Sequence, residues 1–353
     1  MITRWILGEP SAVFLLVEFC ACAVLVILAG TRLSRYGNWI GQVTGLSGAW
    51  IGVVFLACAT SLPELATAVG TVLAVADKRA AADLAFGDLF GSCAFNLLII
   101  VLLDALSRRE SALGRGRRGQ VLTAAGGAMM LGVAALGLIV ASLVAPGLGW
   151  VFSVIIAALY FVMVRVTFTH ERAHADERDE VDQVAYRGTK SSLYGRFAVA
   201  AGVIVATGVW LAKIGEALAT VKFRVGGGTF MLGESFVGTL FLAVATSMPE
   251  VVVTVAAFRI GAVNMALGNL FGSNVFNVAI IPICDVAARG RLFAYGSTRS
   301  LIPLCLAVAM TGVAILGLTR RPARRRWRLG FDSVALLLLY VFGMIVLLRY
   351  GGH

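Results

Sequence analysis

One two-part module occurs twice in this chain. Residues 55–69 read FLACATSLPELATAV and residues 241–255 read FLAVATSMPEVVVTV, and nine of these fifteen positions are identical at an offset of 186. A second pair of blocks follows, AFGDLFGSCAFNLLII at 85–100 and ALGNLFGSNVFNVAII at 266–281, with ten of sixteen positions identical at an offset of 181. The repetition predicts two structurally equivalent halves.

Each module carries one acidic residue within an apolar stretch, Glu64 in the first copy and Glu250 in the second. A carboxylate in hydrocarbon costs several kcal/mol unless it is paired or hydrated, so an acid inside a membrane helix indicates a functional site. Because both copies contain the acid at the same place, a purely structural explanation is disfavoured.

Composition places the modules in a membrane. Of the 353 residues, 59% are hydrophobic and only 14% are charged. Apolar runs of about 20 residues, the length that crosses a bilayer core, recur along the chain. The net charge of +11 is accounted for by basic loops on the cytoplasmic side, so it does not indicate a nucleic-acid partner.

Hydropathy predicts an all-α membrane protein with ten transmembrane helices. Their expected ranges are 11–30, 43–76, 83–106, 119–143, 148–168, 196–220, 232–258, 261–286, 298–319 and 328–349. With the N-terminus placed outside, 20 basic residues fall inside and 9 outside. The positive-inside rule therefore predicts that both chain ends lie outside and that the central polar loop is cytoplasmic.

Five helices separate equivalent positions of the two modules, so the copies are expected to run in opposite directions across the membrane. The predicted organisation is a five-helix repeat at 1–168, a cytoplasmic connecting loop at 169–195 and a second, inverted five-helix repeat at 196–353. Alternating-access transporters use inverted repeats of this kind, and their substrate site lies near the midplane where the repeats meet.

The TSxPE sequence of each module supplies oxygen ligands. Pro63 and Pro249 lack an N–H and crowd the preceding turn, so we expect each helix to break there. The freed backbone carbonyls, the adjacent Thr and Ser hydroxyls and the glutamate are hard oxygen donors, which suit cations such as Ca²⁺ and Na⁺.

The second block adds polar groups at helical spacing. Ser92 and Asn96 are four residues apart, as are Ser273 and Asn277, so each pair lies on one helix face. Small-xxx-small glycine pairs, which allow helices to approach closely, flank them at Gly87, Gly91, Gly268 and Gly272. Together the modules predict a small cage of oxygen ligands supplied in duplicate.

ATSxPE followed by G[ND]LFGSxxFN, present twice in inverted order, resembles the α-repeats of the Ca²⁺/cation antiporter superfamily, in particular its sodium/calcium exchanger branch. The resemblance implies ligand roles for Glu64, Asn96, Glu250 and Asn277. It implies further ligands from Thr60, Ser61, Ser92, Thr246, Ser247, Ser273 and the backbone carbonyls near Ala57 and Ala243. It also implies that the first and sixth helices slide against a rigid core. Asn277 departs from the pattern of many relatives, which have Asp there, so two acids rather than three would face the ions.

The function predicted from these features is secondary antiport of Na⁺ against Ca²⁺ by alternating access. The alternative is H⁺/divalent cation antiport through the same two glutamates. A cation channel is a third possibility, although channels usually build charged rings from oligomeric symmetry. An enzyme is not expected, because no nucleophile–base pair or metal triad is present in the sequence.

We expect no cofactor, only transported Na⁺ and Ca²⁺ as ligands. The expected surroundings are a lipid bilayer, without nucleic acid or an obligate protein partner. The expected location is the plasma (inner) membrane of a bacterium, as a multi-pass protein.

Overall fold

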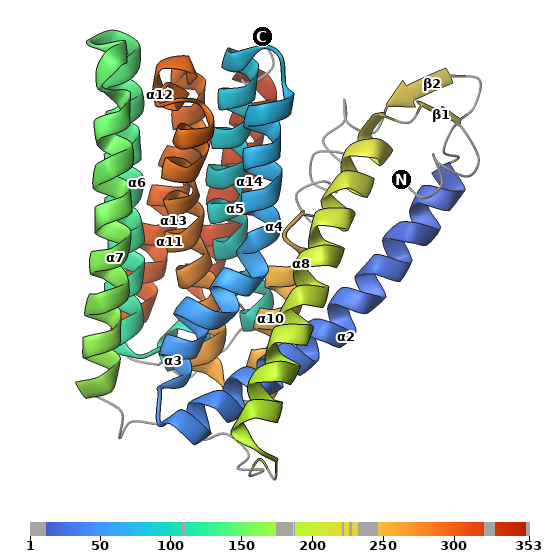
Figure 1. Cartoon of the computed structure of the whole chain (residues 1–353), viewed down its shortest axis with the longest axis vertical. Helices are drawn as coiled ribbons and strands as arrows, with labels where there is room; N and C mark the ends of the chain where they lie inside the picture. Colours follow the sequence, from blue (N-terminus) through green and yellow to red (C-terminus); the bar gives the residue numbers. More distant parts are fainter. Residues whose placement is uncertain are drawn as a thin grey trace.

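The computed structural model describes residues 12–107, 111–173, 186, 188–220, 222–225, 228–231, 246–320 and 329–350. Long helices form a bundle (Figure 1). The first half contains α2 (Ala12–Thr44), α3 (Gly48–Trp50), the π-helical turn η1 (Ile51–Leu56), α4 (Ala57–Ala74), α5 (Lys78–Leu106), α6 (Arg118–Leu143) and α7 (Gly149–Ala173). The second half contains α8 (Lys190–Thr220), α10 (Met248–Arg259), α11 (Val263–Ala287), α13 (Leu301–Thr319) and α14 (Phe331–Tyr350). The shorter elements are η2 (Leu113–Arg115), η3 (Pro146–Leu148), α12 (Leu292–Tyr295), η5 (Thr298–Ser300) and the strands β1 (Lys222–Val225) and β2 (Gly228–Met231).

Within the described residues, eight helices are long and apolar enough to cross a membrane, and Phe331–Leu347 forms a shorter apolar helix. The chain is therefore a multi-pass membrane protein, as its hydropathy predicts. The predicted seventh helix, 232–258, is described only from residue 246 onward. The central connection is shorter than predicted, because α7 continues to Ala173 and α8 begins at Lys190.

The chain is almost entirely helical, as predicted, and one short pair of strands is the exception. Strands β1 and β2 pair antiparallel, with Lys222 opposite Met231 and Val225 opposite Gly228. Only two glycines separate the strands in the sequence, and glycine readily adopts the positive φ angles that tight hairpin turns require. This pair of strands lies in the predicted connection between the sixth and seventh helices, beyond the end of α8.

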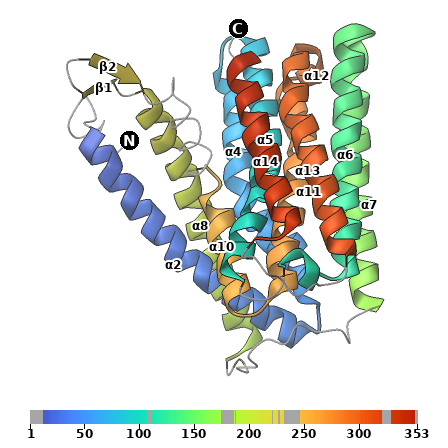
Figure 2. The same cartoon turned by 180° about the vertical axis from the view of Figure 1, so that it is seen from behind.

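The bundle has an enclosed centre and a slanted pair of helices at its side. In α5 and α11, 67% of the most apolar stretch is buried, against 28% in α2 and 22% in α7. Helices α2 and α8 pack against each other and lean away from the remaining helices, as both views show (Figures 1 and 2). The two halves of the sequence are thus interleaved, since each contributes one helix to this pair and one to the centre.

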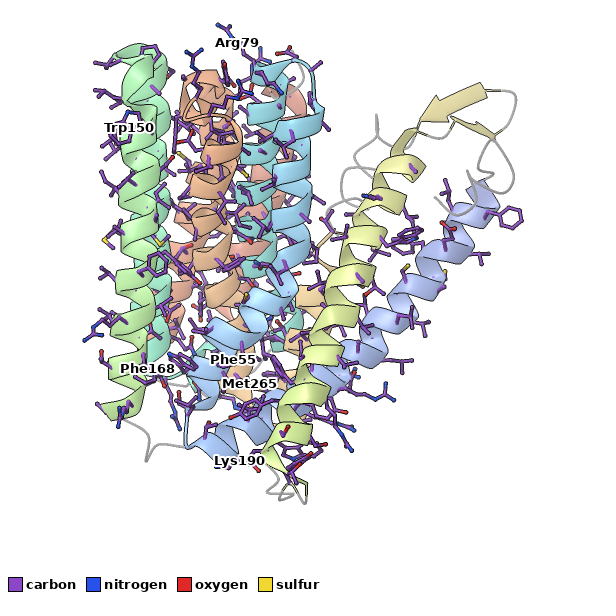
Figure 3. The ribbon with its side chains drawn as sticks, in the orientation of Figure 1. Phe55, Arg79, Trp150, Phe168, Lys190 and Met265 are labelled. Carbon is purple, nitrogen blue, oxygen red and sulfur yellow. The ribbon has the colours of Figure 1, made fainter. Side chains whose placement is uncertain are left out.

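The central helices run in opposite directions. Arg79, at the start of α5, lies at the end of the bundle where Trp150 also lies, whereas Phe168 and Lys190 lie toward the other end (Figure 3). Helix α11 finishes near the Arg79 end, because α12 follows it there (Figure 1). The second blocks of the two modules are therefore antiparallel, as expected for inverted copies.

Helix breaks were expected at Pro63 and Pro249, and the structure confirms only the one at Pro249. In the second copy the helix is interrupted at Ser247 (φ −93°, ψ 15°), and α10 begins at the next residue, directly before Pro249. In the first copy α4 continues through Pro63, and the irregular segment is the π-helical turn η1 that precedes it. π-helical turns of this kind are frequent at functional sites.

The glycine prediction also holds for one copy. A Cβ at Gly268 would lie 2.5 Å from the Ala49 carbonyl oxygen, and one at Gly272 would lie 2.5 Å from the Val53 backbone. These glycines therefore permit α11 to cross α3 and η1 in close contact. For the equivalent Gly87 and Gly91 the prediction is untested, because residues 235–239, which correspond to 49–53, lie outside the described part of the chain.

Two buried aspartates join the halves at the ends of the central helices. Asp104, near the end of α5, accepts a short hydrogen bond from the Ser333 hydroxyl of α14. The equivalent Asp285, near the end of α11, accepts from the Ser153 hydroxyl of α7 at 2.7 Å. Each carboxylate also accepts a backbone N–H just beyond its own helix, at 2.7 and 2.8 Å. Each central helix is therefore anchored to the opposite half of the chain.

Candidate functional site

The two TSxPE segments meet in the interior. The Ser61 hydroxyl on α4 donates to Glu250 Oε1 on α10 at 3.1 Å, although the two residues are 189 positions apart. Both side chains are fully buried. This contact brings the equivalent elements of the two modules together, as an inverted-repeat site requires.

Thr60 connects the first segment to α11. Its hydroxyl lies 3.4 Å from Ser273 Oγ, 3.5 Å from Asn269 Oδ1 and 3.4 Å from the carbonyl oxygen of Ala57. All four groups are fully buried. The Thr60 hydroxyl can donate its one proton to only one of these three oxygens at a time. The oxygens around Thr60 therefore keep lone pairs that can accept a further hydrogen bond or a cation.

Several buried oxygens of the site have no hydrogen-bond partner in the part of the chain that the structure describes. They are both carboxylate oxygens of Glu64, Oε2 of Glu250, Oδ1 of Asn96 and Oδ1 of Asn277. An unpaired polar atom in a protein interior is costly, and an unpaired carboxylate more so. Bound cations would satisfy all five oxygens, which come from four helices and from both halves of the chain.

The charges in this region are negative. Glu64 interacts electrostatically with Glu250 and with Asp88. In the part of the chain that the structure describes, no three His, Cys, Asp or Glu side chains gather in a metal-binding group. The donor set is therefore two carboxylates supplemented by neutral oxygens, which suits hard cations rather than metals that need His or Cys.

Most of the predicted ligands are buried. Those at most 2% exposed are Thr60, Ser61, Glu64, Asn96, Ser247, Glu250, Ser273 and Asn277. Ser92 is also buried, and Thr246 is half-buried. Ala57 has its carbonyl oxygen beside Thr60, whereas Ala243 lies outside the described residues.

Two asparagines of α11 belong to the cluster, although the sequence pattern did not identify them as site residues. Asn269 donates to Thr254 Oγ1 at 2.9 Å, and Asn274 is hydrogen-bonded to Asn96 at 3.0 Å. Both differ from their counterparts in the first copy, so a search for identical positions passes over them. A signal was present for Asn269, which precedes Ser273 by four residues and shares its helix face.

Comparisons with known proteins agree over nearly the whole chain. The family model described as "Sodium/calcium exchanger protein" matches residues 14–169 and 192–349. An uncharacterized membrane protein of Methanocaldococcus jannaschii is 23% identical over 328 residues, which cover 92% of each chain. The sodium/calcium exchanger MaX1 of Methanosarcina acetivorans is 32% identical over 114 residues, 32% of this chain and 31% of MaX1.

Solved structures of the sodium-calcium exchanger NCX_Mj share the fold. The form soaked with 2.5 mM Na⁺ and 0.1 mM Ca²⁺ superimposes with a TM-score of 0.69 at 17% identity, covering 96% of this chain and 99% of that chain. The form soaked with neither ion gives a TM-score of 0.67 at 17% identity, covering 96% and 100%.

Proposed function

Because the chain belongs to the sodium/calcium exchanger family, we propose that it exchanges Na⁺ for Ca²⁺ across the membrane by alternating access. Members of this family are transporters, so the protein is not an enzyme. The observation that carries the specific proposal is the group of five buried oxygens without hydrogen-bond partners, on Glu64, Asn96, Glu250 and Asn277.

Charge explains how one cage can serve both ions. Glu64 and Glu250 together carry two negative charges, which one Ca²⁺ or two Na⁺ neutralise equally. Either load removes the electrostatic cost of burying two carboxylates, whereas an empty or half-filled cage leaves net charge in a low-dielectric interior. The ions therefore compete for the site, and movement of the loaded cage is favoured over movement of the empty one.

The remaining predicted ligands are neutral groups of the same two modules. We assign Thr60, Ser61, Ser92, Thr246, Ser247, Ser273 and the carbonyls of Ala57 and Ala243 to the same cage. Their oxygens are neutral, so they complete the coordination of the ions without changing the charge balance.

Ten helices in two inverted repeats would provide alternating access. Gly208 of α8 packs against both motif prolines, with its Cβ position 2.6 Å from Pro63 Cγ and 3.3 Å from Pro249 Cγ. On α2, Gly30 packs in the same way against Val252 of α10, at 2.8 Å. At both places a glycine lies against apolar side chains. Such contacts support movement of the α2/α8 pair along the central helices, which would open the cage to one side at a time.

Transport by the purified protein in sealed vesicles tests the proposal. An imposed Na⁺ gradient is expected to drive Ca²⁺ uptake, and Glu64→Gln or Glu250→Gln is expected to abolish it while leaving the melting temperature of the protein in detergent within a few degrees. Glu18→Gln, on α2 outside the cage, is the control and should transport normally. Uptake driven by a pH gradient but not by Na⁺ would instead support H⁺/divalent cation antiport.

A further inference from the structure

A buried pair of amides joins the two central helices. Asn96 of α5 donates through Nδ2 to Asn274 Oδ1 of α11 at 3.0 Å. Asn274 in turn donates through Nδ2 to the backbone carbonyl of Cys93, one turn earlier on α5, at 3.1 Å. Asn96 is 1% exposed and Asn274 is 4% exposed, so water does not compete for these bonds.

The chain of bonds has a fixed direction. A backbone carbonyl can only accept, so the end of Asn274 that faces Cys93 must be its NH₂ group. The opposite end of Asn274 is then its carbonyl oxygen, which also only accepts, so Asn96 must present its own NH₂ group there. The Asn96 oxygen is consequently turned to the other side, where it is buried and has no hydrogen-bond partner among residues that the structure describes.

We propose that Asn274 is a positioning residue that orients the Asn96 amide so that its oxygen, and not its NH₂ group, faces the transported ion. The inference rests on the proposed exchange function. An amide turned the other way would direct two N–H groups toward a cation and repel it. Asn274 itself need not touch the ion, because it acts through Asn96.

The second copy lacks this arrangement. Cys93 is the residue equivalent to Asn274, and its thiol lies 3.7 Å from the Asn274 backbone carbonyl. Asn277 is equivalent to Asn96, and its amide interacts with the Cys93 thiol instead of a second asparagine. The two halves of the cage are therefore unequal: Asn96 is held in one orientation, and Asn277 is not held in this way.

A double-mutant cycle separates positioning from simple packing. The probe is Ca²⁺ alone, bound to the purified protein, together with the Ca²⁺ dependence of flux. Asn274→Ala is expected to weaken Ca²⁺ binding by about 10-fold, as loss of a residue that orients a metal ligand commonly does. In an Asn96→Ala background the same substitution should have no further effect. Asn274→Cys, which copies the first half, should behave as Asn274→Ala does.

Val275→Ala is the matched control, because it truncates a buried side chain beside Asn274 on α11 that lies toward Gly127 of α6 and takes no part in the amide bonds. It should leave Ca²⁺ binding unchanged. Equal losses from Asn274→Ala with and without Asn96 would overturn the positioning role. Binding that Glu250→Gln fails to weaken would reject the proposed ion site itself, whereas Glu250-dependent binding with additive Asn96 and Asn274 effects would reject only the positioning.

Discussion

Asp88 and Asn269 occupy equivalent positions in the two modules but have different surroundings. Asn269 is fully buried and hydrogen-bonded to Thr254. Asp88 is partly exposed, lies 3.5 Å from the Thr67 hydroxyl and interacts electrostatically with Glu64. Asp88 therefore adds negative charge near Glu64, whereas the equivalent Asn269 is neutral.

This difference predicts a one-sided effect on ion affinity. Asp88 lies about two turns nearer than Asn96 to the start of α5, the end expected outside. Asp88→Asn should raise the half-saturating ion concentration on that side by about 3- to 10-fold, which corresponds to roughly 1 kcal/mol of lost attraction. Half-saturating concentrations measured separately on each face of oriented vesicles check this.

Asp77→Asn is the control for that experiment. Asp77 caps α5 by accepting from the Arg79 backbone N–H at 2.9 Å, and asparagine caps a helix about as well as aspartate. The substitution thus removes one charge from the same helix without disturbing it. Equal shifts on both faces, or an equal shift in the control, would contradict a local role for Asp88.

At the scale of elements, the contact between α11 and η1 is closer than ordinary helix packing. Gly52 of η1 contributes to it, because a Cβ there would lie 2.2 Å from the Met265 carbonyl oxygen. Backbone rather than flexible side chains forms the contact, so added atoms cannot be accommodated by a change of rotamer.

Gly272→Ala and Gly312→Ala test this contact as a pair, since Gly312 is an exposed glycine of α13 with no described neighbour within 4 Å of its Cβ position. Gly272→Ala should destabilise the protein by about 1–3 kcal/mol, because the methyl group would meet the Val53 backbone. Gly312→Ala should be neutral or stabilising by up to about 1 kcal/mol, the difference in helix propensity. Melting temperatures in detergent measure both, and a larger loss for Gly312→Ala would refute the explanation.

At the scale of the whole molecule, each half holds the other's central helix. Besides the Asp104 and Asp285 bonds, Asp83 at the start of α5 accepts from the Ser297 backbone N–H at 2.7 Å, and the equivalent Asn264 of α11 accepts from the Arg117 backbone N–H at 2.9 Å. Both ends of α5 and α11 are therefore attached to the opposite half. Such reciprocal anchoring is consistent with the rigid centre that the proposed movement of the α2/α8 pair requires.

The sidedness of the molecule is open to a direct test. Figure 3 places Arg79 and Lys190 toward opposite ends of the bundle, and the basic-residue bias assigns the Lys190 end to the cytoplasm. In an active background without native cysteines, Arg79→Cys should react with a membrane-impermeant thiol reagent in intact cells. Lys190→Cys should react only after permeabilisation, and the reverse pattern would invert the assigned topology.

Much of the fold and of the cage could be inferred from the chain alone, because the signals concerned are local or repeated. Long apolar runs must span a bilayer whatever their neighbours are, and an acid such as Glu64 within one of them requires compensation. Because the module is repeated at Glu250, the sequence also predicted that the two copies lie together in the interior. The hydrogen bond between Ser61 and Glu250 confirms this.

Other features depend on contacts between distant segments. Whether Pro63 breaks its helix depends on what satisfies the freed carbonyl, and here α4 stays helical while η1 takes the irregular geometry. The orientation of Asn96 depends on Asn274, a residue 178 positions away. Of the equivalent residues Asp88 and Asn269, only Asn269 is fully buried, with the Thr60 and Thr254 hydroxyls beside its side chain. Side-chain partners and burial arise from tertiary packing, so no local pattern of residues can specify them.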